Sequence, residues 1–598
     1  MTIARDSVAV DRTWGAEGVF ATPAAWESEY EELLASLPAL TKLRGRVAAD
    51  AGSLGEVLEA RDAVSRRLGR LMAYAEMAYA VETTNTEAVA RHGRAQAAAA
   101  QVGAAIAFVD PEVIAAGRER VEEWLSMDPS LAVYRHAVDD LFRLESHTRS
   151  GEVEEVLGLA RDAFSGPYNA YSAFADSDLV FEPAISRAGE SFPVTQGTID
   201  AVLAHPDRDV RRQGWESYSD GYLGARNLLA ATFSTTVKQA LFSARVRRHP
   251  SALAASLAAS NIPVAVFDNL IEVFEANLPT WHRYWRLRRD VLGLDRLAPY
   301  DVAAPLGEST PMFSYEQCVD WICESLVPLG VEYVETVRRG CLEDRWVDVY
   351  PTAGKMGNAF SAGSPTTSPF IMMNFDGTAV SLGTLAHELG HSMHSFLTWQ
   401  AQPQPYTYYS MFVAEVASNF NQALLRAHLL ATVNDPAILL AVLDEAVSNF
   451  HRYFFLMPTL ARLEREMHER VEGGEGLTAE LLGERTADLF AEGFGPDVEI
   501  DRERLGITWA KFAHLYEPFY VYQYATGISA AHALAGGVLA AKDGAAHDYL
   551  AFLSAGDSLY PLDALRLAGV DMTGPEPVEA AFGVLASLVD RIEELTAP

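Results

Sequence analysis

The stretch SLGTLAHELGHSMHSFL, residues 381–397, places three histidines and one glutamate in an otherwise apolar run. At the α-helical rotation of about 100° per residue, His387, His391 and His394 fall within about 60° of one another. The large apolar residues share the opposite side of the helix: Leu382, Leu385, Leu389, Met393 and Phe396. The stretch therefore predicts a helix that packs on a core with one face and presents imidazoles on the other.

Within this helix, His387, Glu388 and His391 form the pattern H-E-x-x-H. Two histidines one helical turn apart can bind one Zn²⁺, and the glutamate between them can act as a general base. Gly383 and Gly390 flank the histidine face and would let another chain segment approach closely. The motif also occurs by chance, so packed core or surface histidines remain an alternative at this point.

A catalytic zinc site needs a third protein ligand and an open position for water. The first acidic residue after His391 is Glu415, in the helical segment 408–430. Glu415 shares a polar helix face with three other residues, Ser418, Asn419 and Gln422. We expect Glu415 to be the third ligand rather than a solvated surface residue. We expect His394 to support the ligands or to pack in the core rather than to bind the metal.

The sequence pattern predicts that the remainder of the chain is mostly helical. Helical periodicity covers nine stretches: 23–43, 54–82, 86–107, 131–147, 197–243, 263–291, 314–328, 435–472 and 575–595. Strand signals are few, at 344–351 and at 368–377, directly before the histidine helix. The sequence therefore predicts a mainly α protein with one small sheet beside that helix.

Length and composition set the size class and narrow the partners. A chain of 598 residues, 49% of them hydrophobic, exceeds the usual single domain and can build large cores. We expect a boundary near 185, which gives domains 1–185 and 186–598. The formal net charge of −34 disfavours nucleic acid and anionic membranes as partners.

Three features favour a cytoplasmic location. The N-terminal residues lack an apolar run typical of a secretory signal, and we expect no stretch apolar enough to span a bilayer. The three cysteines are an odd number in a long chain, which suits a reducing compartment and buried thiols.

Segments spread over almost the whole chain resemble the oligoendopeptidase F family, zinc oligopeptidases related to thimet oligopeptidase. Those that carry the resemblance are TWGAEGVF (13–20), YAEMAYAVETTNTEA (74–88), NIPVAVFDNLIEVFEANLPTWHRYWRLRRDVLGLD (261–295), LGTLAHELGHSMHS (382–395), FVAEVASNFNQ (412–422) and FYVYQYATGISAAHA (519–533). H-E-x-x-H alone is weak evidence, whereas these segments in this order are specific.

The resemblance implies a mainly α, two-lobed helical zincin-type fold with a deep channel. It implies one zinc ion held by His387, His391 and Glu415, and cleavage of internal bonds in short peptides. Folded proteins would be excluded by the channel. Two positions depart from the family: Gln422, where Glu is usual, and Met356 in GKMGNAFSAG (354–363), where a basic or small residue is expected.

In the expected mechanism, Glu388 takes a proton from the attacking water and passes it to the departing amine. The oxyanion needs a further donor. The segment 514–527 offers several, and the resemblance favours His514 and Tyr524, followed by Tyr522; core packing is equally open for each tyrosine. The strand at 368–375 is either an ordinary buried strand or a template that pairs with extended peptide.

Two other functions stay open. The same chemistry would serve an exopeptidase, which needs a charged anchor for a peptide terminus that the sequence does not identify. The second alternative hypothesis is a catalytically silent helical protein that binds peptides. It is disfavoured by the intact motif residues His387, Glu388, His391 and Glu415. The sequence does not indicate an oligomeric state.

Overall fold

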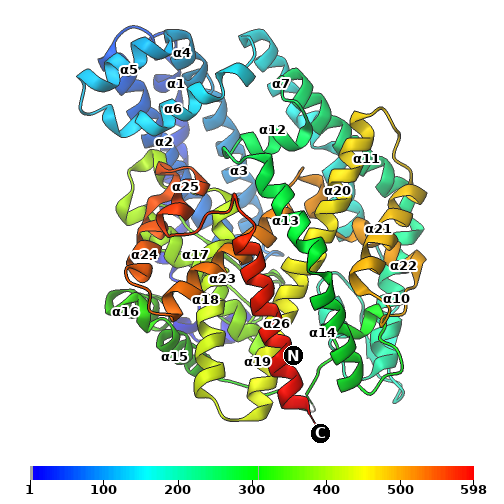
Figure 1. The fold of residues 1–598 in the computed structure, drawn as a ribbon. Helices are drawn as coiled ribbons and strands as arrows, with labels where there is room; N and C mark the ends of the chain where they lie inside the picture. Colours follow the sequence, from blue (N-terminus) through cyan, green and yellow to red (C-terminus); the bar gives the residue numbers. More distant parts are fainter. Residues whose placement is uncertain (1–3, 308, 598) are drawn as a thin grey trace. The chain divides into compact units, whose positions relative to one another are not determined.

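The computed structural model describes residues 4–307 and 309–597, and most of them are helical (Figure 1). The fold divides into two compact units. Unit 1 comprises the described residues up to 146 together with 312–428 and 534–569; unit 2 comprises those of 147–311, 429–533 and 570–597. The mainly α prediction is confirmed.

The helices of unit 1 are α1 (Pro23–Thr41), α2 (Ala51–Ala80), α3 (Thr86–Ile106), α4 (Val109–Ala116), α5 (Arg118–Met127), α6 (Arg135–Arg143), α15 (Tyr315–Ser325), α16 (Val331–Leu342), α17 (Ala379–Ala401), α24 (Ala545–Ala555) and α25 (Pro561–Leu567). Those of unit 2 are α7 (Gly151–Phe164), α8 (Gly166–Ala173), α9 (Ile199–Leu203), α10 (Arg208–Gly224), α11 (Arg226–Val246), α12 (Ala252–Ala258), α13 (Val264–Ala276), α14 (Leu278–Val291), α19 (Pro436–His451), α20 (Met457–Glu472), α21 (Ala479–Phe494), α22 (Arg502–Gly506) and α26 (Glu576–Thr596). Two helices contain residues of both units, α18 (Met411–Thr432) and α23 (Tyr522–Leu539).

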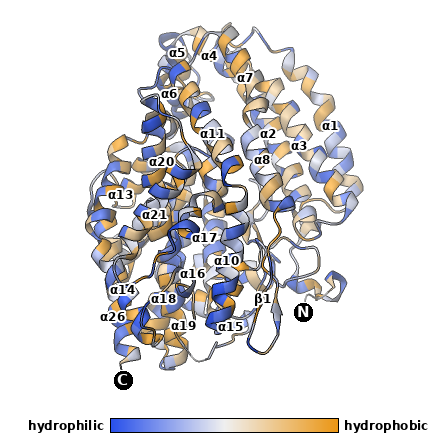
Figure 2. Cartoon of the chain, turned by 90° about the vertical axis from the view of Figure 1, so that its right-hand side faces the viewer, coloured by the Kyte–Doolittle hydropathy of each residue, from blue (hydrophilic) through white to orange (hydrophobic). Residues whose placement is uncertain are grey.

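Unit 1 is built on the amphipathic helices α1, α2 and α3, along which polar and apolar residues are mixed (Figure 2). Side-chain caps begin the first two: Thr22 accepts from the Ala25 N–H, and Asp50 accepts from the Ser53 N–H. Their buried faces form one core, which extends to Phe370 of the small sheet. The helical layer thus rests directly on the strands that precede α17.

The small sheet contains β3 (Val347–Asp348), β4 (Phe360–Ala362) and β5 (Phe370–Met372), in the order β3-β5-β4. β5 pairs in parallel with β3 and antiparallel with β4. The predicted sheet is confirmed, but the idea that the strand within 368–375 offers a free edge to a peptide is wrong, because both of its edges are paired. The two outer strands of the sheet are β3 and β4, and β4 is the one paired antiparallel with β5.

Unit 2 packs around aromatic side chains. Trp281 and Trp285 of α14 are fully buried, and both rings contact Phe455. Phe455 lies in a π-helical turn, η10 (Arg452–Leu456), between α19 and α20. The expected helix over 435–472 is therefore three successive segments. A two-stranded hairpin, β1 (Ala184–Ile185) and β2 (Ser191–Phe192), completes the unit.

The predicted boundary at 185 stays a prediction, since each compact unit draws on separated stretches of the chain. The expectation that no stretch suits a membrane needs correction. By length and composition alone, one stretch of the described chain, 86–116, qualifies, and a third of its apolar window is buried. In the structure this stretch divides into α3 and α4, and α3 packs on α1 and α2. The cytoplasmic location stays a prediction.

Candidate metal centre

Helix α17 carries the histidines as predicted. The Thr378 hydroxyl accepts from the Ser381 N–H and caps its first turn. Leu385 and Leu389 are fully buried on the apolar face. The helix packs on α24 (Figure 1). Near its far end, the Thr398 hydroxyl donates to the Leu553 carbonyl of α24 at 2.8 Å. Helix α17 is therefore held in place on both sides of the H-E-x-x-H motif.

His387, His391 and Glu415 come together in unit 1. The two imidazole centroids lie 4.9 Å apart at 85°, and His387 Nε2 lies 3.6 Å from Glu415 Oε2. One ligand atom from each of the three residues lies within 4.8 Å of the others. Atoms at these separations can surround a single zinc-sized cation, whose bonds to nitrogen and oxygen are about 2.0–2.2 Å long.

Close packing of α17 on α18 places Glu415 beside the histidines. An added Cβ at Gly390 would lie 2.4 Å from the Ala417 carbonyl oxygen and 2.6 Å from the Ser418 Cα. Only glycine permits this backbone approach, as the sequence indicated for Gly390. The Ser418 hydroxyl also donates to Glu415 Oε2 at 3.2 Å, which orients the carboxylate.

Gly390→Ala is expected to lower the free energy of unfolding by about 1–3 kcal/mol and to weaken metal binding, since α17 and α18 must separate. Gly103→Ala in α3 is the matched control, because nothing lies within 4 Å of its added Cβ. Replacing a glycine inside an exposed helix turn is expected to stabilise by about 0.5–1 kcal/mol. Thermal unfolding with and without metal measures both; equal melting temperatures for the two variants would contradict the close-packing explanation.

Glu388 lies on the same helix and is 6% exposed. Its Oε2 is buried and has no hydrogen-bond partner among the described residues. Burial raises its pKa to about 7, an effect opposed by His387 and reinforced by Glu415. A buried carboxylate oxygen without a partner, beside three metal-type ligands, fits a site built for a metal and a water molecule.

The surroundings of His391 and His387 determine which ring nitrogens are free to bind a metal. Burial lowers the pKa of His391 to about 4, so its ring is neutral and can offer a lone pair. The Nδ1–H of His387 can donate to Gln422 Oε1, 3.1 Å away, which leaves Nε2 directed toward Glu415. The amide of Gln422 contacts His387 without adding charge, so this position, expected to depart from the family that the sequence resembles, lies beside the site.

Two other sequence-predicted residues lie outside the group of three. His394 is buried and stacks on Tyr409, with centroids 3.7 Å apart, and burial lowers its pKa to about 3. Met356 packs partly buried on the core of α1–α3, and its N–H donates to the Ala80 carbonyl. An effect of Met356 on substrate preference stays a prediction. No pattern in the sequence indicated Tyr409, whose hydroxyl forms a hydrogen bond with that of Ser395 at 2.7 Å.

The segment 514–527, here called the tyrosine segment, belongs to unit 2. His514, Tyr520 and Tyr524 cluster there: the Tyr524 hydroxyl donates to that of Tyr520 at 3.4 Å, and the His514 ring meets that of Tyr524 edge-on at 5.7 Å. Tyr522 instead is 2% exposed, packs against Phe267, and has a pKa raised by burial. The catalytic roles of His514, Tyr522 and Tyr524 stay predictions, and burial favours a packing role for Tyr522.

A strained turn lies within the tyrosine segment, at Phe519. Phe519 has φ of 57°, which is uncommon for a residue with a bulky side chain, and its N–H donates to Glu464 Oε1 at 2.6 Å. Glu464, on α20, is fully buried. Burial raises its pKa to about 8, an effect opposed by the Phe519 N–H and reinforced by Glu517. A protonated Glu464 therefore holds the turn at neutral pH.

Glu464 makes stability depend on pH. Its pKa rises from 4.5 in the unfolded chain to about 8 in the folded one. The folded state therefore holds the proton more tightly, and the free energy of unfolding falls by about 1 kcal/mol per pH unit as the pH rises from 4.5 to 8. Glu464→Gln is expected to remove that decline, whereas Glu484→Gln, at an exposed position of α21, is expected to retain it. Denaturant unfolding at pH 5 and pH 8 checks this; an unchanged slope in Glu464→Gln would contradict it.

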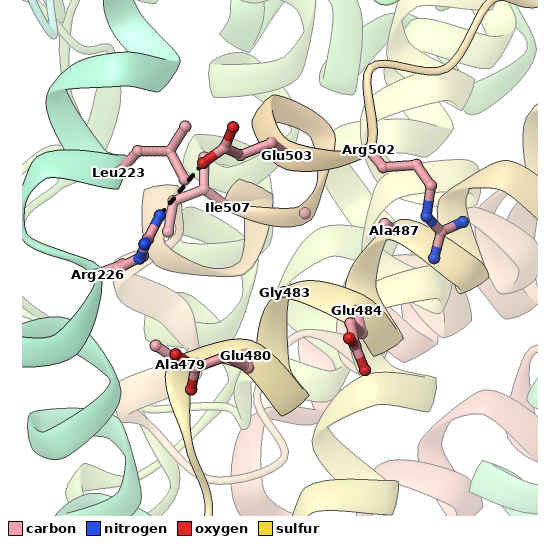
Figure 3. A pocket seen from close by; sticks show the side chains of 11 residues that line it. Leu223, Arg226, Ala479, Glu480, Gly483, Glu484, Ala487, Arg502, Glu503 and Ile507 are labelled. Carbon is pink, nitrogen blue, oxygen red and sulfur yellow. Dashed lines mark hydrogen bonds and ion pairs between the residues drawn. The ribbon is translucent and has the colours of Figure 1, made fainter.

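A pocket of unit 2, about 290 Å³ in volume, lies among α10, α11, α21 and α22 (Figure 3). It carries charges of both signs, and Arg226 pairs with Glu503 at 3.2 Å across it. None of the residues that the sequence singled out lines this pocket. The candidate metal centre is therefore a separate feature, in unit 1.

Comparisons with known proteins identify the family of this chain. The family model for peptidase family M3 matches residues 201–584, and the one for oligopeptidase F matches 112–181. Oligopeptidase PepF of Bacillus subtilis is 37% identical over 99% of this chain and 88% of its own length. Group B oligopeptidase PepB of Streptococcus agalactiae is 34% identical over 98% of this chain and 97% of its own length.

Among solved structures, oligoendopeptidase-F from Enterococcus faecium aligns with a TM-score of 0.75 and 30% identity, over 95% of this chain and 98% of its own. The matches span nearly the full length of the chain in both sequence and structure. The resemblance seen in the sequence segments is confirmed. The chain belongs to peptidase family M3 and is a zincin-type metallopeptidase.

Proposed function

We propose that this metallopeptidase is a zinc endopeptidase that cleaves internal bonds of short peptides. The observation that carries the proposal is the group formed by His387, His391 and Glu415, with the buried Glu388 beside it. Two nitrogen ligands and one carboxylate are typical of catalytic zinc sites. The names of the relatives, oligopeptidases and oligoendopeptidases, support short peptides as substrates.

The three ligand residues would hold zinc, which when bound polarises a carbonyl oxygen and lowers the pKa of a water molecule. Glu388 accepts the proton of the attacking water at its carboxylate and later donates it to the amine of the leaving peptide. Its burial keeps that proton from bulk solvent. Gln422 holds the His387 ring so that Nε2 remains available as a ligand.

The peptide backbone has a candidate template in the outer strand β4. Among the strands of the described residues, β4 pairs with β5 alone, so its other edge has no strand neighbour there and can form main-chain hydrogen bonds to an extended peptide. The Ser361 hydroxyl lies 2.8 Å from that of Ser392 on α17, so β4 is tied to the helix that carries the histidines. We infer that substrate adds along β4 rather than along β5.

Donors for the developing oxyanion are proposed from the tyrosine segment. His514 and Tyr524 have the appropriate chemistry, because an imidazole or a phenol can donate a hydrogen bond without competing for the metal. Tyr522 is the weaker candidate, since its ring is buried against Phe267.

A quenched peptide with an internal cleavage site tests the function. Purified protein is expected to cleave it, to lose activity with a chelator, and to regain activity when zinc is added. Mass spectrometry of the products separates internal cleavage from removal of terminal residues, which would indicate an exopeptidase. Peptide binding without any cleavage by the zinc-loaded protein would instead support the silent peptide-binding alternative.

A further inference from the structure

Tyr409 lies at the start of the helix that carries Glu415. It is the second residue before α18, and the Ser410 carbonyl that follows it accepts from the N–H groups of Val413 and Ala414 in the first turn of that helix. Glu415 comes next in the same helix. Because residues within one helix keep fixed separations, a shift of Tyr409 and of this helix start would carry the carboxylate of Glu415 with it.

Three contacts join Tyr409 to the histidine helix α17. Its ring stacks on that of His394, with centroids 3.7 Å apart and planes 7° apart. Its hydroxyl donates to the His391 carbonyl at 3.4 Å and lies 2.7 Å from the Ser395 hydroxyl. All four residues belong to unit 1. One side chain therefore contacts a full turn of α17, and that turn begins at a proposed metal ligand.

The hydrogen-bond chemistry assigns a direction to these contacts. A phenol has one proton to donate, and Tyr409 donates it to His391, so the Ser395 hydroxyl is the donor in the other bond. In an α-helix, the carbonyl of residue 391 also accepts from the N–H of residue 395. The bond from Tyr409 is thus an additional one, and it ties the backbone of His391 to the start of α18.

A second close contact holds the same two helices farther along α18. At Gly390 the backbone of α17 lies against α18, since an added Cβ would be 2.4 Å from the Ala417 carbonyl oxygen. Glu415 lies between the two contacts in the sequence, after Tyr409 and before Ala417. Contacts on both sides of Glu415 restrict the distance of α18 from α17 and its sliding along α17.

We infer that Tyr409 is a positioning residue of the candidate metal centre, which holds His391 and Glu415 at the separation that one cation requires. This inference rests on the proposed function, because it concerns the zinc ligands named there. Groups behind metal ligands orient those ligands, and replacing such a group typically costs about 10–100-fold in metal affinity. Tyr409 acts on the backbone of His391, whereas Gln422 contacts the ring of His387.

The zinc affinity of Tyr409→Phe tests the inference. Phenylalanine keeps the stacked ring and removes only the hydroxyl, so zinc affinity is expected to fall by about 10-fold or more. Competition with a fluorescent zinc chelator measures the affinity. The visible spectrum of the cobalt-loaded protein is a second readout, because the absorption bands of Co²⁺ depend on the geometry of its ligands. These bands are expected to shift in the variant.

Tyr406→Phe is the matched control. Tyr406 precedes α18 in the same connection, and its hydroxyl accepts from the Ala137 N–H of α6 at 3.2 Å rather than contacting α17. This variant also loses a hydrogen bond of a tyrosine hydroxyl, but it is expected to keep the zinc affinity and the cobalt spectrum of the wild type. An equal loss of zinc affinity in both variants, or a wild-type affinity and spectrum in Tyr409→Phe, would overturn the inference.

Ser395→Ala is the second variant, for use if Tyr409→Phe does not fold. It removes one of the two bonds to the Tyr409 hydroxyl, so zinc affinity is expected to fall in the same direction but by less. If both variants fold, the double variant is expected to bind zinc no more weakly than Tyr409→Phe, because the serine acts through the phenol. If Tyr409→Phe is unfolded, a wild-type zinc affinity in Ser395→Ala would overturn the inference.

Peptide cleavage by the wild-type protein separates this inference from the proposed function. If zinc-loaded protein does not cleave the quenched peptide, the peptidase proposal fails, and the zinc affinities still decide the role of Tyr409. If it cleaves the peptide while Tyr409→Phe binds zinc as tightly as the wild type, only the role of Tyr409 is rejected. A wild-type protein that binds no zinc would reject both.

Discussion

Replacing Glu388 by glutamine is expected to lower the turnover of a quenched peptide by about 10²–10⁴-fold while zinc content stays at one ion per chain. Glutamine keeps the size of the side chain and removes only its ability to accept the proton of water. Glu388 is not one of the three grouped ligand residues, so the metal should be retained. Peptide cleavage and metal analysis on the same preparation measure both effects.

Glu335→Gln, at an exposed position of α16, is the control for loss of one acid from unit 1 and is expected to match the wild type in both measurements. Loss of zinc from Glu388→Gln would mean that Glu388 is a ligand and that the roles assigned to it and to Glu415 are wrong. Full turnover in the variant would mean that another group removes the proton.

Replacing Glu415 is expected to weaken zinc binding itself. The loss should exceed the roughly 10–100-fold that follows removal of a residue behind a ligand, because a direct ligand is lost. Glu415→Ala removes the carboxylate outright. Glu415→Gln keeps the volume and an oxygen that can still accept from the Ser418 hydroxyl, so a weaker affinity there cannot be ascribed to a misfolded α18.

Competition with a fluorescent zinc chelator gives the affinities of the wild type and both variants. Circular dichroism of the same samples checks that the helices are retained. Unchanged zinc affinity in Glu415→Ala would remove Glu415 from the site and leave the third ligand unidentified.

The histidine helix, and the position of Glu415 beside it, could be predicted because both depend on local helical periodicity. The apolar spacing of α17 predicts which face is buried, and Leu385 and Leu389 are fully buried there. Glu415 was the first acid after the motif and lay on a polar helix face. Gly390 signalled a close approach, and α18 makes it at Ala417 and Ser418.

Long-range pairing limited the prediction elsewhere. The strand in 368–375 was recognised from its apolar run, but its central position depends on β3 and β4, which pair with it from both sides. Neither strand order nor a third strand of three residues has a strong local signature. The sequence therefore left open whether this strand is buried or offers an edge, and the structure shows the buried, central strand.

Backbone irregularities also could not be predicted from the sequence. One π-helical turn between α19 and α20 shifts the helix phase by part of a turn, and the apolar run YFFLM is compatible with either phase. The left-handed Phe519 is unusual for its residue type and is held by Glu464, which lies far away in the sequence. Such contacts depend on tertiary structure rather than on propensity.

An anomalous difference map, collected at the zinc absorption edge from crystals of zinc-loaded protein, tests the proposed centre most directly. We expect one peak per chain, about 2.0–2.2 Å from a ring nitrogen of His387, a ring nitrogen of His391 and a carboxylate oxygen of Glu415. A peak bound by other residues, or Glu415 turned away from a metal held by the histidines alone, would contradict the account.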